Sequence, residues 1–409
     1  MFLLTFAFSM VTVLFMVSKK INIGISLLTG GTLLMLLNQV GAKVILNTYT
    51  LTFTSEQTIS LALTIGLISI LGHLLEVYGI MNKMIDSMEG MLRSAKATIL
   101  IAPAVIGTLL VTGGALMSCP VVGSLGDRLE LSMEKRASAN LVFRHALYFI
   151  FPFSPPLILA AELGDFNIWD FIRIQFPIAI TMYVLGYLFY IRSAKTHRPP
   201  KTDMREYLQN IKSFILFSMP IWISFVGALI FKLPFYVSLA GGIVVCRLLA
   251  IKSSETSALE TGFFIHIKQG FKGKMVLAII GIMFFKNVVN NFDDLYIYIK
   301  SLIDLGIPLE LLIVVSAAVI CFPLASTQPG IAILFPIILP MAPDYHTKLL
   351  YGMFIYTSSF LFYYISPLHM CQVLTLEYFN VDMKSLYKHY VPILPVTFLV
   401  MVGVYFLML

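Results

Sequence analysis

The sequence predicts an all-α polytopic membrane protein with about 10 transmembrane helices and two re-entrant hairpins, arranged as two inverted repeats. Three observations predict this class. The 409 residues are 58% hydrophobic and 12% charged, about half of the ~25% charged share that is usual in soluble domains. Apolar runs of membrane-spanning length recur from end to end. Two stretches with glycine and proline interrupt these runs at matching places in the two halves.

The first half contains five predicted spans. They are Phe2–Val17, Ile21–Leu37, Ile59–Ile80, Asn140–Leu163 and Phe171–Ile191. The first one lacks the basic start and the cleavage site of a signal peptide, so we keep it as a span. Asn38–Gln57 is polar and predicts a loop with an interfacial piece. Asn140–Leu163 contains Ser154-Pro155-Pro156, and because proline disfavours helix at and before its position, we expect this span to be unwound in its middle.

Hairpin one is predicted around Thr112-Gly113-Gly114 and Pro120. Its apolar arms are Ala97–Val111 and Val121–Leu125, and a charged segment follows at Asp127. Neither arm reaches the ~20 residues that a full crossing needs, so the chain is expected to enter the membrane and turn back.

The second half repeats this plan after a polar linker. Its predicted spans are Ser213–Phe231, Pro234–Ile251, Met275–Leu295, Tyr351–Leu374, which breaks at Ser366-Pro367, and Val391–Leu409. Lys252–Lys274 is expected to be a basic connection. Hairpin two is flanked by Ile307–Leu324 and Ile331–Met341. We therefore divide the chain into a first repeat at 1–197, a cytoplasmic linker at 198–211 and a second repeat at 212–409.

Two arguments support the inverted arrangement. Gly114 and Pro120 recur as Gly330 and Pro336, 216 residues later, and Ser154-Pro155 recurs 212 residues later. Each half has an odd number of spans, which turns the second half upside down. Placing Lys19 and Lys20 inside puts 21 of the 28 basic residues on the cytoplasmic side, as the positive-inside rule requires. The prediction is a multi-pass protein of the cell membrane with both termini outside, in which hairpin one enters from the cytoplasm and hairpin two from outside.

The four predicted breaks define a candidate site. Non-helical backbone at membrane depth is stable only inside protein or beside a water-filled cavity, so we expect the breaks to converge. Helix ends there suit an anion, and freed carbonyls suit Na⁺. The alternative for each hydroxyl is a helix cap or a bond to its own helix. The candidate residues are Thr112, Gly113, Gly114, Ser118, Ser154, Pro155, Ser326, Thr327, Gln328, Gly330, Ser366 and Pro367.

Polar residues within the spans extend this set. We add Asn287, and we add His369 because it adjoins the second break, where it could also respond to pH. For His145 a structural role is favoured. An ion pair between Glu76 and Lys286 is one structural alternative, and snorkelling of Arg144 and Lys286 to the interface is another.

The predicted function is secondary active transport of a small anionic solute of the carboxylate type, coupled to Na⁺ or H⁺, with alternating access around a midplane site. A passive anion channel is the alternative. An intramembrane enzyme is less favoured, since HExxH and GxSxG motifs are absent and Ser124-Leu125-Gly126-Asp127 lacks the first glycine of an aspartyl-protease motif.

The partners expected are the solute and the lipid bilayer. The net charge of +7 is explained by cytoplasmic loops, so no nucleic acid is expected. No cofactor is expected, nor any metal beyond Na⁺ at the hairpin tips.

Several of these segments resemble a prokaryotic family known as domain of unknown function 401, over nearly the whole chain. They are Thr112–Pro120, Phe143-Arg144-His145, Ser366–Cys371 and Glu377-Tyr378-Phe379. That family is grouped with the ion-transporter superfamily of gluconate, citrate, dicarboxylate and arsenite permeases. The resemblance implies inverted repeats with re-entrant hairpins, anion transport driven by Na⁺ or H⁺, and a homodimer. The dicarboxylate branch has Ser-Asn-Thr at both tips, and the asparagine is missing from both tips here.

Overall fold

The computed structural model describes residues 2–108, 114–195, 203–252, 262–292 and 294–409. Every regular element in these ranges is a helix, so the predicted all-α class is confirmed. By length and hydropathy, four helical segments of the described residues can each cross a membrane: Glu56–Val77, Ile168–Ile191, Met204–Ala228 and Met383–Met408. A fifth crossing is the pair Ile297–Asp304 and Leu309–Leu324, which is bent by 120°.

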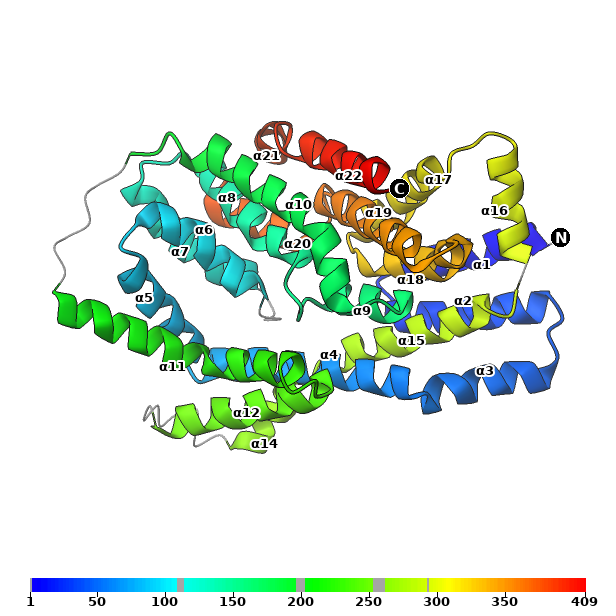
Figure 1. Cartoon of the computed structure of the whole chain (residues 1–409), viewed down its shortest axis with the longest axis horizontal. Coiled ribbons are helices and arrows are strands. Elements are labelled where there is room, and N and C mark those ends of the chain that lie inside the picture. The colour runs from blue at the N-terminus through cyan, green and yellow to red at the C-terminus, as the bar shows by residue number, and fades with distance from the viewer. Residues whose placement is uncertain (1, 109–113, 196–202, 253–261, 293) are drawn as a thin grey trace.

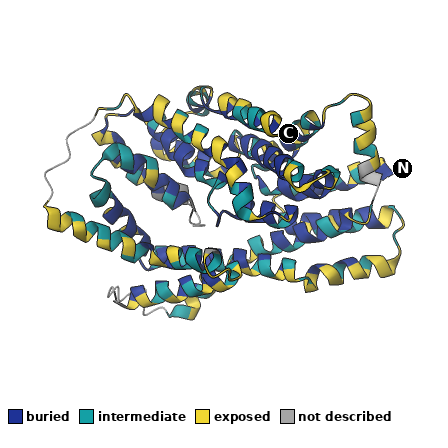
Figure 2. Cartoon of the chain, viewed as in Figure 1, coloured by how far each residue is buried: buried dark blue, intermediate teal, exposed yellow. Residues whose placement is uncertain are grey.

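Apolar side chains face outward on several of these helices. The most apolar part of Met204–Ala228 is only 17% buried, and that of Met383–Met408 is 28% buried. Figure 2 shows exposed residues along the outer faces of the molecule. A water-soluble chain does not expose apolar surface over such lengths, so this is a membrane protein. The total of about 10 crossings and the inverted orientation of the halves stay predictions.

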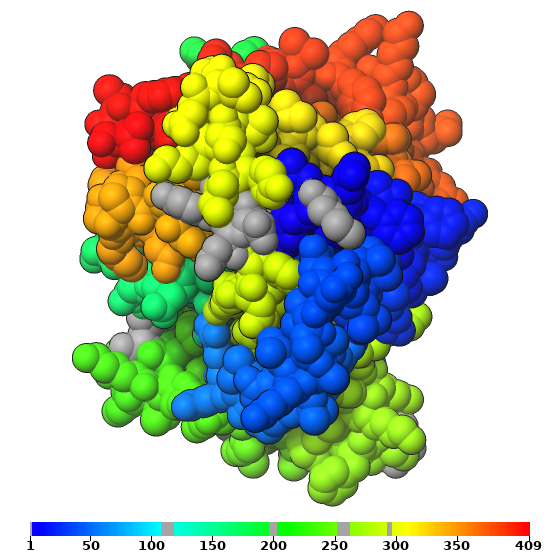
Figure 3. Space-filling model, turned by 90° about the vertical axis from the view of Figure 1, so that its right-hand side faces the viewer, coloured from blue at the N-terminus to red at the C-terminus, as the bar shows by residue number. Residues whose placement is uncertain are grey.

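The helices form two layers, which lie one above the other in Figure 1. The lower layer contains α2 (Ile23–Leu37), α3 (Ala42–Thr54), α4 (Glu56–Val77), α5 (Ile80–Leu92), α11 (Met204–Leu229), α12 (Phe235–Lys252), α14 (Phe263–Gly270) and α15 (Gly273–Val289). The upper layer contains α6 (Ala95–Thr108), α7 (Gly114–Arg128), α8 (Met133–Ala146), α9 (Pro155–Gly164), α10 (Ile168–Gly186), α17 (Leu309–Leu324), α18 (Gln328–Ile338), α19 (Tyr345–Tyr364), α20 (Met370–Phe379), α21 (Met383–Tyr390) and α22 (Leu394–Met408). Helices α1 (Phe2–Ser18) and α16 (Asp294–Asp304) lie at one end, where Figure 3 shows the two halves side by side.

Each half contributes its first helices to the lower layer and its later helices to the upper layer. The same pairings occur in both halves: α6 packs on α8 as α17 packs on α19, and α1 packs on α2 as α11 packs on α12. The second arm of each hairpin packs on the broken span of the other half, α7 on α20 and α18 on α9. This pattern is the one expected of repeats that interlock, and it brings the breaks of both halves into one layer.

Helices α2 and α15 cross in backbone contact at the centre of the lower layer. A Cβ on Gly24 would lie 2.0 Å from the Leu277 carbonyl oxygen, and a Cβ on Gly281 would lie 2.2 Å from the Gly24 oxygen. The Asn22 side chain accepts from Gly24 N–H, and its Nδ2 donates to the Lys274 carbonyl at 2.8 Å. Small residues permit this approach, and one helix from each half takes part.

Some connections contain helices that the sequence did not indicate. The predicted loop at 38–57 contains α3, the basic connection at 252–274 contains α14, and α16 precedes hairpin two. The suggested ion pair between Glu76 and Lys286 is wrong. Helix α15 runs antiparallel to α4, so Lys286 donates to Gln57 at 3.0 Å, 19 positions or about 28 Å along α4 from Glu76.

Candidate functional site

The first broken span unwinds where proline requires it. Helix α8 ends at Ala146, a 3₁₀ turn covers Leu147–Phe149, and the chain is non-helical until α9 starts at Pro155. Pro155 and Pro156 occupy the first positions of α9, where a missing N–H costs little. Ser154 caps α9 by position, but its side chain makes no capping bond. The hydroxyl of Ser154 is therefore available at the N-terminus of a helix.

Hairpin two turns within three residues. Helix α17 ends at Leu324, and Ala325 adopts a left-handed conformation with φ +47°. Thr327 then caps α18 without a side-chain bond. A Cβ on Gly330 would lie 2.3 Å from Ser359 Oγ and 2.5 Å from Cys321 Sγ. The glycine therefore lets α18 pack closely between α17 and α19.

These two breaks face one cavity of about 230 Å³. Ser154 and Pro155 line it from break one, and Ser326, Thr327 and Gln328 line it from hairpin two. The wall also includes the last turn of α6, the end of α19 and the first turn of α15. The remaining lining residues are Gly107, Tyr148, Pro156, Met275, Ala325 and Tyr363. The structure thus brings five of the predicted site residues together, between the two layers.

The cavity wall carries hydrogen-bond donors and no acidic side chain among its described residues. Two helix N-termini, those of α9 and α18, meet at it, and each has a partial positive charge. Ser154 is 2% exposed and its Oγ has no hydrogen-bond partner. Next to the wall, the buried Arg144 packs on Gly107, where an added Cβ would lie 2.5 Å from Arg144 Cγ. A guanidinium keeps its charge at any physiological pH, so Arg144 adds a positive charge to the region beside the wall at Gly107.

The second break holds its own polar groups. Ser366 Oγ accepts from Leu368 N–H at 3.2 Å, and the Ser366 carbonyl accepts from Gln372 at 3.3 Å. The hydroxyl of Ser366 is therefore used in a local turn before α20, and Pro367 is exposed. Neither lines the cavity. His369 caps α20 and lies 2.7 Å from the hydroxyl of Tyr363, so it contacts a cavity residue without lining the cavity itself.

Only part of hairpin one lies within the described residues. Thr112 and Gly113 lie outside the described residues, and Gly114 is the first residue of α7. Ser118 is fully buried in α7. The neighbouring Cys119 accepts from Asn140 of α8 at 3.3 Å, and the same amide donates to Thr375 of α20 at 3.0 Å. These bonds fix α7 against both broken spans. Gly107, near the end of α6, is the residue of the first arm that lines the cavity.

Asn287, another predicted site residue, does not line this cavity. Its Nδ2 donates to Thr52 of α3 at 3.0 Å, within the lower layer. In the other direction, sequence reasoning missed Tyr148 and Tyr363. Both lie within seven residues before a break, and an aromatic residue at that position is the signal that could have identified them.

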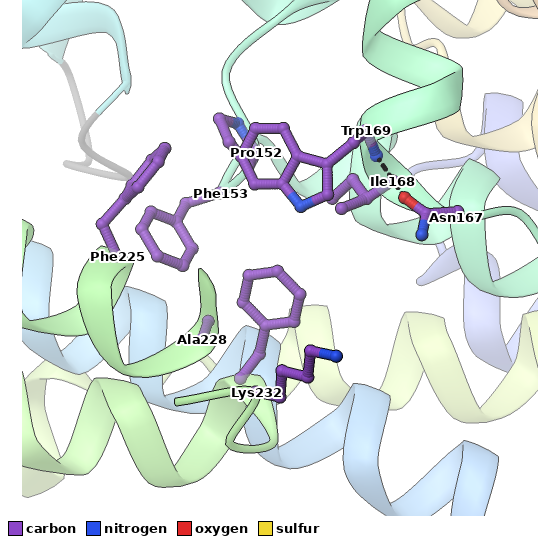
Figure 4. Close-up of a pocket in the computed structure, with 9 residues that line it drawn as sticks. Pro152, Phe153, Asn167, Ile168, Trp169, Phe225, Ala228 and Lys232 are labelled. Atoms are coloured by element: carbon purple, nitrogen blue, oxygen red, sulfur yellow. Dashed lines mark hydrogen bonds between the residues drawn. The ribbon is translucent and has the colours of Figure 1, made fainter. Parts of the chain in front are cut away.

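A second cavity, of about 410 Å³, lies beside the break of the first broken span, where Pro152 and Phe153 line it. Figure 4 shows Asn167, Ile168 and Trp169 across the space from Lys232, which lies between α11 and α12. The ring of Phe153 meets that of Phe225 edge-on at 5.2 Å. This cavity also lies between the two layers, so break one borders both the 230 Å³ cavity and the 410 Å³ cavity.

Fold and site together define an all-α membrane protein in which broken helices of two interlocked halves surround a cavity lined by apolar side chains and several hydrogen-bond donors. The chain belongs to the family described as protein of unknown function (DUF401), whose profile matches residues 2–408. No curated protein matches the sequence. Among solved structures, the chain resembles the Alcanivorax borkumensis YdaH transporter, whose crystal structure is described as revealing an unusual topology. The TM-score is 0.62 at 16% identity, and the match covers 90% of this chain and 88% of that one. At this identity the likeness shows a shared fold.

Proposed function

We propose that this protein is a secondary active transporter of a small anionic solute of the carboxylate type, driven by a Na⁺ or H⁺ gradient. The observation that carries the proposal is the 230 Å³ cavity, at which two helix N-termini meet with no acidic side chain among the described lining residues. The fold shared with a solved transporter supports transport as the class of function.

The chemistry of the wall favours an anion over a cation. The hydroxyls of Ser154, Ser326 and Thr327 can all donate, and the N–H groups of Gln328 and Gly330 lie in the first turn of α18, where a helix has no internal acceptors for them. Oxygen atoms of a carboxylate accept such bonds, and the bonds are stronger when the acceptor is charged. Arg144 adds a fixed positive charge nearby. A bound cation would lack a negative side chain among these residues.

The size and place of the cavity fit a small solute that moves between two sides. Drug-sized ligands occupy pockets of roughly 300–1,000 Å³, so 230 Å³ suits a smaller molecule. The cavity lies between the layers, with Met275 from the lower layer and all other lining residues from the upper layer or its connections. A shift of one layer against the other would change which side the cavity opens to, which is the alternating access of transporters built from repeats.

A thermal-stability screen of the purified protein tests the substrate class. Candidate carboxylates are compared with amines, with and without Na⁺ at two pH values. A ligand that binds only the folded protein at 100 times its dissociation constant stabilises it by about 2.7 kcal/mol. Ser154→Ala should weaken the response to the carboxylate. Ser218→Ala is the matched control, because the Ser218 hydroxyl donates to Phe214 O of its own helix. Stabilisation by amines alone would exclude an anion site.

The passive channel is separated from the carrier by flux in reconstituted vesicles. A carrier gives saturable uptake that a Na⁺ or H⁺ gradient drives, whereas a channel gives single-channel currents. The homodimer implied by the family resemblance stays a prediction, and the mass of the purified complex measures it.

A further inference from the structure

A cluster of three metal-binding side chains lies beside the cavity wall at Tyr363. His145 belongs to α8, His369 caps α20, and Cys371 is in the first turn of α20. One ligand atom from each residue lies within 4.8 Å of the other two. The cluster joins the first broken span to the second, and the proposed carboxylate site does not use it.

The hydrogen bonds of the two histidines leave one nitrogen atom of each ring free of backbone, and both free atoms lie near the hydroxyl of Tyr363. Nδ1 of His145 lies 2.7 Å from the Leu141 carbonyl oxygen. A carbonyl only accepts, so Nδ1 carries the hydrogen and Nε2 presents a lone pair. Nδ1 of His369 faces the Tyr364 carbonyl at 3.4 Å in the same way. This arrangement, with one ring nitrogen held by a carbonyl and the other free, is the one that metal-binding histidines adopt.

The hydroxyl of Tyr363 lies near the lone pairs of both histidines. The Tyr363 oxygen lies 2.7 Å from Nε2 of His369 and 3.4 Å from Nε2 of His145. A phenol has a single hydrogen, so it satisfies only one of the two nitrogen atoms. The other lone pair is left facing a buried space, since His145 is fully buried and His369 is 2% exposed. A cation that accepts electron pairs would satisfy both.

Cys371 supplies a third ligand of suitable chemistry. The other three cysteines are buried, whereas Cys371 is half-buried and adjoins the N-terminus of α20. Tetrahedral zinc has Zn–N of ~2.0–2.1 Å and Zn–S of ~2.3 Å, so its ligand atoms are about 3.5 Å apart. The three ligand atoms lie within 4.8 Å of one another, so side-chain shifts of about 1 Å bring them to this spacing.

We propose that His145, His369 and Cys371 form a binding site for a soft transition-metal ion of the Zn²⁺ or Cu⁺ class. Two imidazoles and a thiolate suit these ions and not Na⁺, Mg²⁺ or Ca²⁺, which prefer oxygen. The buried charge of Arg144, one residue before His145, opposes a cation. Metal binding releases the thiol proton of Cys371 to solvent, so Cu⁺ adds no net charge beside Arg144, whereas Zn²⁺ adds one positive charge.

A bound ion would link α8 to the start of α20 and fix the second break. On the basis of the proposed transport function, we expect such a link to inhibit uptake, because the broken spans could no longer move independently. The site would thus regulate transport without touching the solute.

Co²⁺ titration of the full-length purified protein tests the site, because a cobalt–thiolate bond gives a near-ultraviolet charge-transfer band and tetrahedral cobalt gives strong visible bands. We expect one equivalent of Co²⁺ to produce both, and Zn²⁺ or Cu⁺ to displace it. His369→Ala should abolish the signal. Cys371→Ser should remove the near-ultraviolet band, while Cys246→Ala, which changes a buried cysteine of α12, should retain it. Absence of the band in the wild type, or an unchanged band in Cys371→Ser, overturns the proposal.

A transport measurement addresses the consequence separately. Zn²⁺ should reduce uptake by wild-type vesicles at least tenfold and leave Cys371→Ser uptake within twofold of its metal-free rate. Cobalt binding with no effect of Zn²⁺ on uptake would refute the regulatory role and leave the metal site standing. A protein that binds Co²⁺ but transports no anion would refute the proposed function alone.

Discussion

Substitution of Gly330 by alanine tests whether close packing at hairpin two supports the site. The new Cβ would lie 2.3 Å from Ser359 Oγ, 2.5 Å from Cys321 Sγ and 3.0 Å from Ser359 Cβ. All three atoms are buried, since both residues lie in the packed region between α17 and α19. Overpacking of this kind costs about 1–3 kcal/mol. Helix α18 must move to relieve it, and the tip residues Ser326 and Thr327 move with it.

The expected result for Gly330→Ala is a lower unfolding midpoint and a weaker stabilising response to the carboxylate ligand. Gly403→Ala is the control, because nothing lies within 4 Å of the Cβ it would add to α22. Adding Ser359→Gly and Cys321→Ala removes the atoms that collide, so this triple variant should recover part of the loss. Gly330→Ala with wild-type stability and wild-type ligand response would refute the packing argument.

Three further substitutions probe other features. Ala325→Gly should stabilise the fold by up to about 1 kcal/mol in chemical denaturation. The left-handed conformation costs alanine ~1–2 kcal/mol, and glycine avoids this cost but loses a smaller amount through the greater entropy of its unfolded chain. A lower stability of the variant would contradict this. Gly24→Ala should destabilise by about 3 kcal/mol, the upper end for overpacking, since its Cβ meets backbone that no rotamer can move. Gly403→Ala, with open space around it, should not lower the stability in the same denaturation assay. Hydrogen bonds from Ser385 hold the pKa of Asp382 below its usual value. The cap of α21 is therefore present above the ordinary carboxyl pKa and lost as pH falls through the lower folded value. Hydrogen exchange in α21 should accelerate at acidic pH in the wild type and be fast at all pH values in Asp382→Ala, and equal protection of the two proteins at neutral pH would count against the cap.

The breaks could be predicted from sequence because their causes are local. Pro155 and Pro156 cannot continue the preceding helix, whatever surrounds them, and the start of α9 follows from that constraint. The tip of hairpin two was likewise visible as a polar interruption between apolar arms. Convergence on one cavity was an inference from the cost of unpaired backbone in lipid, and for break one and hairpin two the structure shows it.

The partners of individual side chains could not be predicted, because they depend on which helices are neighbours. Asn287 has the polarity of a site residue, but α15 faces α3 at that point and Thr52 binds it. The pairing of Lys286 with Gln57 required the antiparallel direction of α4 and α15, which no local pattern encodes. The contact between Tyr363 and His145 joins residues 218 positions apart, and nothing in either segment indicates the other.

The backbone crossing of α2 and α15 has a consequence for how the protein is made. Asn22 and Lys274, bonded at that crossing, are separated by 252 residues of chain. When α2 leaves the ribosome, the helix that will cover its glycine face does not yet exist. The first half therefore stays in the bilayer with that face against lipid or a chaperone until α15, at residues 273–289 of 409, has been made. Contacts this distant in sequence slow folding, so the glycine face of α2 remains unpaired for at least the time that synthesis of the intervening 252 positions takes.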